Sequence, residues 1–495
     1  MARVRGEHPL LRVLTTAGPA YWVAVAALAT VVLAAGYAYI TRQLAFGLGV
    51  TGLNTQVTWG LYIVNFVYFI GLSAGGIIVA ALAHAAGVRR LEPVGRIAEL
   101  GAISCLVLAT IFITLDLGRP ERLWHLLIYG RPGSPLTWDV IVIILYLLTA
   151  LALGYFSARR DVVKLMALLP HRKRLYRWLA LGRLDLSDAA VHRDQGILRA
   201  LAVVSIPMAV ALHSVTAWIL GLLKAQPGWH SALIAPLFVA SAVASGLALV
   251  ILSTVVARAL LRVPVAEEVI YSLGRVLALV LPVLGYFLFA ELLTVTYARE
   301  TAPAAIFYDI MQGRLAPLFW FDLVLGIVVP LGILWFPGLP ARWVIRLPSP
   351  ALRPAAAAAA VVLLLGALWM TVRAPQAAVE LPAAALRAWA MAAAVIAALA
   401  LLPSLMPTRT AAIGVAAGLV VMGVFAERTL IVVPSQFHRL LPFPSGAYTP
   451  TPTEWLITAG VYALGGLSFL TLAKILPIVP LEADDGPAEA HGPKS

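Results

Sequence analysis

A few polar side chains interrupt long apolar stretches of this sequence. His213 lies deep within one such stretch, Glu291 lies within a second, and Asn65 within a third. Asp139 and Asp322 stand near the start of two more. A His or a carboxyl in an apolar setting can exchange protons with a redox-active molecule. The same side chain can instead form an interhelical hydrogen bond, and that is the commoner role for any single one.

The stretches around these residues are long enough to cross a bilayer, which takes about 20 mostly apolar residues as a helix. With 61% hydrophobic and only 12% charged residues, the chain lacks the polar surface of a soluble protein. The runs are continuous, which favours helices over the alternating pattern of a β-barrel. The sequence therefore predicts an all-α polytopic membrane protein with about 10–12 transmembrane helices. The predicted runs are 20–40, 57–83, 97–115, 137–157, 198–222, 231–257, 271–297, 316–337, 355–372, 384–402, 411–432 and 455–475.

Basic residues are spread unevenly over the segments between these runs. If the N-terminus is cytoplasmic and the chain crosses twelve times, 25 of the 36 Lys and Arg fall on the cytoplasmic side. The basic loop 158–197 contributes most to this asymmetry. We therefore expect both termini, 1–19 and 476–495, to be cytoplasmic. The same rule explains the net charge of +13 without a nucleic-acid partner.

Cysteine and histidine usage limits the cofactors that this chain could hold. Cys105 is the only cysteine, so the chain by itself cannot supply the ligands of an iron–sulfur cluster or a Cys-type zinc site. A haem with two axial His ligands needs facing His residues at similar depth, and only His213 lies deep in a run. We expect no haem, cluster or metal here, so a redox partner would have to carry the clusters.

The predicted outer segments are rich in Pro, Gly, Trp and Tyr. They are 116–139, 224–230, 298–316 and 433–454. Such segments suit a docking surface or the mouth of a site, although aromatic residues also gather at any membrane interface. Two small-residue motifs, GLSAGG at 71–76 and SAVASG at 241–246, indicate either a repeat of four-helix units or close helix packing.

Several segments, in order along the chain, resemble the NrfD/polysulfide-reductase membrane-subunit family, including Dsr-type, hydrogenase-2-type and alternative complex III members. The segments are WGLYIVNFVYFIGLSAGG (59–76), LDLGRPERLWHLL (115–127), SPLTWD (134–139), HSVTAW (213–218), PGWHSALIAPLFVASAVASG (227–246), AELLTVTY (290–297), RTLIVVPSQ (428–436) and YTPTPTEW (448–455).

The resemblance implies a membrane domain at 20–475 made of two four-helix bundles and flanking helices. The first bundle would span 57–222 and the second 231–432, with an extra hairpin near 355–402 that the usual ten-helix pattern lacks. It also implies a quinol site near the outer side of the first bundle. Carried over by position, the catalytic residues are His213, Asp139 and His125. The binding residues are Trp59, Asn65, Asp116 and Arg119, and a proton path would use Glu291 and Asp322.

The resemblance further implies a role in a respiratory oxidoreductase of the cytoplasmic (inner) membrane. The chain would exchange electrons between menaquinone or ubiquinone and an extracytoplasmic four-cluster ferredoxin-like subunit, with cytochrome c or molybdopterin subunits as further partners. Proton translocation would be a coupled activity. Two other functions stay open from the residues themselves, namely a secondary transporter or proton pump without redox work, and a structural anchor for other subunits.

Overall fold

A computed structural model describes residues 14–85, 91–261, 265–298, 300–335, 408–438 and 446–478, together with Leu11, Val263 and Leu481. Within these ranges ten helices are long and apolar enough to cross a membrane, and no strand is present. The chain is thus an all-α, multi-pass membrane protein, as predicted. The predicted runs 355–372 and 384–402 lie outside the described residues.

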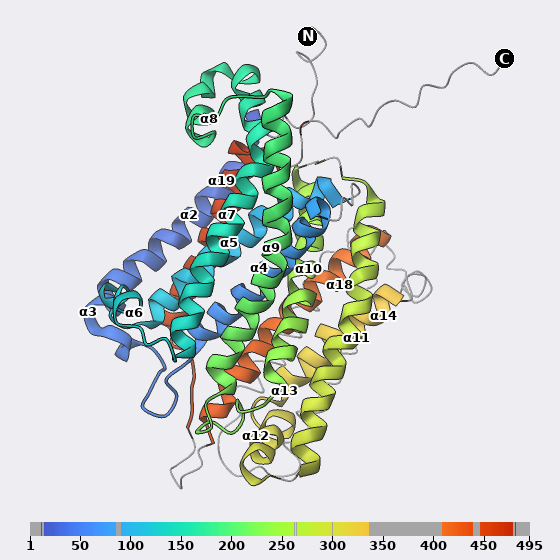
Figure 1. Cartoon of the computed structure of the whole chain (residues 1–495). Helices are drawn as coiled ribbons and strands as arrows, with labels where there is room; N and C mark the ends of the chain where they lie inside the picture. The colour runs from blue at the N-terminus through green and yellow to red at the C-terminus, as the bar shows by residue number, and fades with distance from the viewer. Residues whose placement is uncertain are drawn as a thin grey trace, which may run out of the picture.

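Four long helices that alternate in direction pack together, and we call this set the first bundle (Figure 1). They are α4 (Leu61–Ala85), α5 (Glu92–Asp116), α7 (Pro135–Leu168) and α9 (Asp188–Gly221). The short α6 (His125–Ile128) lies between α5 and α7. Helix α2 (Pro19–Ala38), extended by π and 3₁₀ turns to Val50, packs beside α19 (Pro452–Ile475).

We call a second set of packed helices the second bundle; it contains α10 (Ile234–Leu261), α11 (Glu267–Ala298) and α18 (Arg409–Val432). Its remaining described span begins at α13 (Ala316–Trp320), continues as a π-helix over Phe321–Val328 and ends with α14 (Val329–Trp335). The short α12 (Thr301–Gln312) lies at one end of the molecule, and α8 (Lys173–Leu179) lies at the other (Figure 1). We call these two ends the α12 side and the α8 side.

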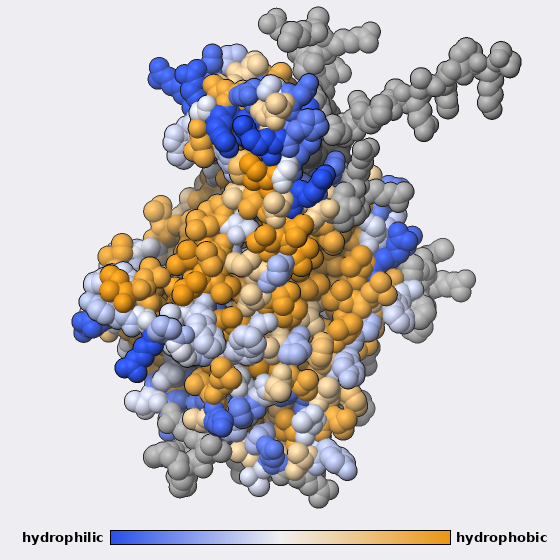
Figure 2. Space-filling view, in the orientation of Figure 1, coloured by the Kyte–Doolittle hydropathy of each residue, from blue (hydrophilic) through white to orange (hydrophobic). Residues whose placement is uncertain are grey.

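The runs predicted from hydropathy coincide with the described spans, but helices α7 and α9 are longer than predicted. The predicted runs 137–157 and 198–222 correspond to helices of 34 residues each, which continue on the α8 side beyond the apolar part. Ion pairs hold this polar extension together, because Arg159 pairs with Asp194 and Arg96 lies 2.5 Å from Asp161. In Figure 2 the extension shows hydrophilic surface above a broad hydrophobic band.

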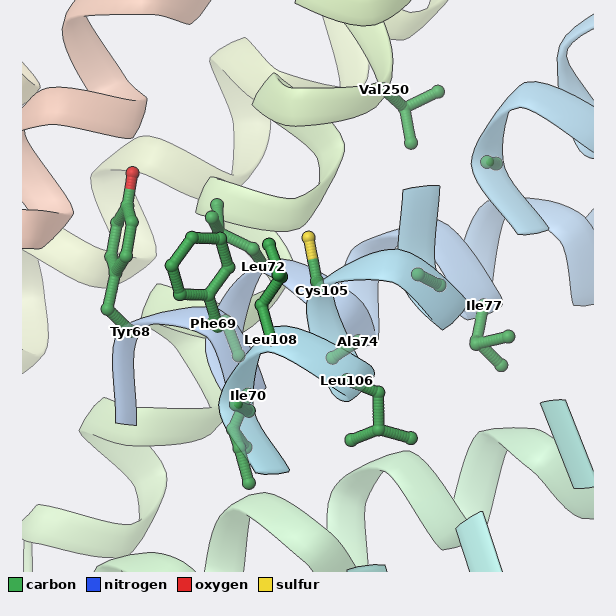
Figure 3. Close-up of a cluster of buried hydrophobic side chains, with 14 of the residues drawn as sticks. Tyr68, Phe69, Ile70, Leu72, Ala74, Ile77, Cys105, Leu106, Leu108 and Val250 are labelled. Atoms are coloured by element: carbon green, nitrogen blue, oxygen red, sulfur yellow. The ribbon is translucent and has the colours of Figure 1, made fainter. Parts of the chain in front are cut away.

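Helix α4 occupies the centre of the fold and is buried over most of its length. Its side chains pack against α5 and α10, as the cluster around Phe69, Leu72 and Leu106 shows (Figure 3). Cys105 is buried in this cluster. Gly75 and Gly246 come into backbone contact where α4 and α10 cross, and a Cβ atom on either would overlap the other. The small-residue motifs thus permit close packing of these two helices.

Candidate functional site

A group of polar side chains connects α4, α5 and α19 near the α12 side. Tyr62 donates a hydrogen bond to Gln43 Oε1 at 2.8 Å, and Gln43 donates to the Leu115 carbonyl at 2.7 Å. One turn deeper, Asn65 Oδ1 accepts a hydrogen bond of 2.7 Å from Tyr462. Gln43, Tyr62 and Asn65 are buried among apolar helices, so each needs such a partner.

Glu454 closes this group at the start of α19. It is fully buried, and its carboxylate accepts hydrogen bonds from the backbone N–H groups of Gly52 and Thr451. Tyr448 donates a third bond of 2.8 Å to the same carboxylate. Burial, and next the negative charge of Glu454, raise the pKa of Tyr448 well above its ordinary value. Tyr448 is therefore a neutral donor at physiological pH.

Asp116, the last residue of α5, interacts electrostatically with Glu454 and Tyr62. Its Oδ1 atom is buried and has no hydrogen-bond partner among the described residues. A buried carboxylate oxygen without a partner is costly. We call this set the end cluster; it comprises Gln43, Tyr62, Asn65, Asp116, Tyr448, Glu454 and Tyr462.

The two other predicted residues of the segment after α5 lie nearer the surface. Arg119 is exposed. His125 is half-buried at the start of α6, where its ring packs edge-on against Trp124 and Tyr129. Both follow Asp116 on the α12 side, but no contact places them in the end cluster.

Trp59 lies just before α4 and stacks on Trp229, with ring centroids 5.3 Å apart. Gln436 fixes the backbone of Trp59. Its side chain accepts a hydrogen bond from the Trp59 backbone N–H and donates one to the Trp59 backbone carbonyl. Trp229 in turn donates to the Ile431 carbonyl at 2.7 Å. The stacked pair therefore joins the first bundle to α18 of the second.

Asp139 and His213 lie on a different flank of the first bundle. Asp139 Oδ1 accepts a 2.6 Å hydrogen bond from Thr216, which connects α7 to α9. His213 Nδ1 lies 2.7 Å from the Ala209 carbonyl of its own helix, and Nε2 lies 3.2 Å from the Ile70 carbonyl of α4. Both residues are buried and already bonded to neighbouring helices.

An apolar pocket lies in the second bundle between α10, α11, α12, the π-helix and α18. Its empty volume is about 1080 Å³, part of which opens outward. Glu291, Asp322 and Glu427 contribute carboxyl groups to the lining, and Trp229 forms part of the wall. Ser231 donates to Glu291 at 2.7 Å, and Ser241 donates to Glu427 at 2.5 Å.

Behind this pocket lies a fully buried arginine. Arg428 Nη1 is 3.5 Å from Glu427, and its guanidinium lies 4.1 Å from the centre of the Phe238 ring. No hydrogen bond satisfies its side-chain nitrogens within the described structure. Asp322 interacts electrostatically with both members of the pair. The three ionisable side chains form a polar centre inside otherwise apolar helices.

The structure thus divides the predicted residues into separate groups. Asn65 and Asp116 share the end cluster, Trp59 reaches the wall of the second-bundle pocket through Trp229, and Glu291 and Asp322 line that pocket. No sequence pattern predicted a role for Tyr62, Gln43, Tyr448, Glu454, Tyr462 or Gln436. One signal for Glu454 was present, since Thr451 and Glu454 form a capping box at the start of α19. In the described part of the chain, no group of three or more His, Cys, Asp and Glu could hold a metal ion.

Comparison with known proteins places this arrangement in context. The family described as polysulphide reductase, NrfD, matches residues 49–379. A putative dimethyl sulfoxide reductase membrane subunit of Halobacterium salinarum is 33% identical over 68% of this chain and 74% of its own. A selenate reductase subunit of Mesobacillus selenatarsenatis is 30% identical over 59% and 69%, respectively. A Hdr-like menaquinol oxidoreductase integral membrane subunit of Archaeoglobus fulgidus is 28% identical over 66% and 74%.

Proposed function

Because the chain belongs to the NrfD polysulphide reductase family, it is a membrane subunit of the oxidoreductase type, and we propose that it binds a quinone or quinol for its complex. The name of the Archaeoglobus relative, a menaquinol oxidoreductase subunit, supports menaquinol as the substrate class. The chain's own contribution is a site within the membrane where ring oxygens meet hydrogen-bonding side chains.

The observation that carries this proposal is the buried, unpartnered Oδ1 atom of Asp116 in the end cluster. A quinol hydroxyl would supply the missing donor and remove the cost of leaving that oxygen unpaired. Tyr62 and Asn65, on the same side of α4, would contact the ring or orient Gln43 and Tyr462 toward it. Trp59, at the start of the same helix, would form an apolar boundary of the site.

Oxidation of a quinol releases two electrons and two protons, and reduction of a quinone consumes them. Asp116 stands at the end of α5, next to the segment on the α12 side, so a proton on its carboxyl has a short route to water. Arg119 and His125 are placed along that segment and would serve this exchange at the surface. The electrons would pass to or from an iron–sulfur subunit docked on the α12 side, which we propose is extracytoplasmic.

Deeper groups suit a proton route coupled to this reaction. His213 connects α9 to the Ile70 carbonyl, and Asp139 is bonded to Thr216 on the same helix. The Asp322, Glu427 and Arg428 centre lies in the second bundle. We propose that these buried groups move protons across the inner membrane while the ring reacts in the end cluster.

Replacing Asp116 tests the site in the assembled complex. The Asp116→Asn variant keeps the shape of the side chain but can no longer take up or release a proton, so quinol turnover should fall at least about tenfold, equivalent to about 1.4 kcal/mol of transition-state stabilisation. Asp188→Asn, on the exposed start of α9 at the opposite end, is the matched control. Equal turnover in the two variants would remove the end cluster as the reaction site.

A proton pump without redox work is the second candidate, favoured by the buried Asp322, Glu427 and Arg428 centre. The two functions differ in what drives proton movement. Proteoliposomes of the complex should acidify or alkalise their interior only when quinol and an electron acceptor are both supplied. Proton movement driven by an ion or solute gradient alone would favour the second candidate.

A further inference from the structure

Features of the first bundle recur in the second. Helices α4 and α10 both start on the α12 side and run in the same direction (Figure 1). Gly75 and Gly246, one from each small-residue motif, meet at the crossing. Each helix is preceded by a tryptophan, and these two, Trp59 and Trp229, stack on one another. The equivalent tryptophans therefore lie face to face, as expected where a two-fold relation connects two parallel repeats.

Each bundle also carries an acidic residue on its second helix. In the first bundle the second helix, α5, carries Asp116 at its α12-side end. In the second bundle the second helix, α11, carries Glu291 two turns before its α12-side end. Asp116 belongs to the end cluster, whereas Glu291 lines the apolar pocket. The end cluster and the pocket therefore each include an acidic residue from the second helix of a bundle.

From this correspondence we infer that the second-bundle pocket is a second binding site for the ring of a quinone. The inference rests on the proposed function and adds a second ring-binding position to it. The lining is largely apolar and aromatic, with Phe289, Phe307 and Phe319 beside Trp229. Such walls suit a flat ring, and a few convergent polar groups suit its two oxygens.

The carboxyl groups decide between a ring and a simple lipid tail. Ser231 and Ser241 hold Glu291 and Glu427 in fixed positions, and Asp322 completes a set of three carboxyls in the lining. An acyl chain has nothing to pair with these groups, and carboxyls are costly in an apolar pocket. A quinone oxygen can accept a hydrogen bond from a protonated carboxyl, and a quinol hydroxyl can donate one to a carboxylate.

The pocket is placed to receive its ligand from the bilayer. Phe289 belongs to the lining, yet its side chain is 60% exposed, so the pocket reaches the outer face of α11. Gly285 lies one turn away on the same helix, and a Cβ there would meet only Ile327 at 3.9 Å. The absence of a side chain at this position keeps the pocket open beside Phe289.

The test counts ring sites on the full chain in nanodiscs of quinone-free phospholipid, with menaquinone-4 as the probe. We expect the wild type to bind two equivalents. Gly285→Phe fills the pocket and should bind one equivalent, whereas Val283→Phe, on the exposed face of the same helix, should still bind two. A photoactivatable azido-quinone on the wild type should label peptides containing 285–292 and 306–323, which checks the assignment without any substitution.

The outcomes separate this inference from the proposed function. If the wild type binds one equivalent that Asp116→Asn loses and Gly285→Phe keeps, the second site is overturned and the end cluster stands. If Gly285→Phe loses the single equivalent and Asp116→Asn keeps it, the pocket is upheld and the end cluster falls. Binding of two equivalents by Gly285→Phe, or no labelling of the pocket peptides, overturns the second site. No binding at all overturns both.

Discussion

The indoles of Trp59 and Trp229 stack nearly parallel, 5.3 Å between ring centroids and 24° between planes. The two residues are 170 positions apart in the chain, and each precedes the central helix of its bundle. The pair stands between the end cluster's helix and the second-bundle pocket. The stacked pair therefore couples the two bundles at the α12 side, so they are not independent units.

Gln436 is expected to hold this pair in place. Its side chain accepts from the Thr58 and Trp59 N–H groups and donates to the Trp59 and Val432 carbonyls. The Gln436→Ala variant leaves these buried backbone groups without hydrogen-bond partners. Its free energy of unfolding should therefore fall by about 1–3 kcal/mol. Thermal unfolding in detergent, followed by tryptophan emission, measures this loss. Gln195→Ala, on the exposed surface of α9, should unfold like the wild type; a drop of equal size would contradict the role of Gln436.

The contact between Gly75 and Gly246 gives a prediction with an internal control. Gly75→Ala places a methyl group against the Gly246 backbone, so the helices must separate and the yield of folded protein should fall. Gly101→Ala adds the same methyl group in α5 where nothing lies within 4 Å. Because alanine favours a helix over glycine by about 0.5–1 kcal/mol, that variant should be as stable as the wild type or more so. Equal effects at both positions would show that the crossing tolerates separation.

The sequence predicted the class and the ten described spans because lipid imposes a simple rule on helix length and polarity. It underestimated α7 and α9, since a helix can continue into water through polar residues that hydropathy ignores. Ion pairs stabilise the polar extension of these two helices. One of them joins Arg159 to Asp194, which are 35 positions apart in the chain.

Sequence reasoning identified buried polar residues but not their groupings. Asn65 meets Tyr462 across nearly 400 positions, and Thr58 and Trp59 meet Gln436 across a similar separation. No local periodicity reports such contacts. The pocket was also missed, because its walls come from elements far apart in the chain and its carboxyls look like isolated polar residues along the sequence.

Chemical labelling tests which side of the membrane each end faces. In a Cys105→Ser background, Trp178→Cys on α8 and Arg131→Cys before α7 introduce exposed thiols at opposite ends. In intact spheroplasts an impermeant maleimide should label Arg131→Cys and spare Trp178→Cys until the membrane is opened. The wild type should stay unlabelled throughout, because Cys105 is buried. The opposite pattern would place the α12 side in the cytoplasm and move the proposed partner there.

His213 gives the sharpest test of a working group inside the helices. Its ring nitrogens face the Ala209 and Ile70 carbonyls, so it connects α9 to the central helix while remaining able to exchange a proton. If it relays protons, His213→Ala should lower quinol turnover in the assembled complex while the amount of complex in the membrane stays normal. The measurement needs both readouts, turnover and complex abundance. Thr216 lies one turn after His213 on α9, and its hydroxyl donates to Asp139. Thr216→Val removes that hydroxyl and tests the Thr216–Asp139 hydrogen bond in the same assay. Normal turnover in His213→Ala, with a lower unfolding temperature, would assign the ring to helix packing, and the proton route would then have to bypass α9.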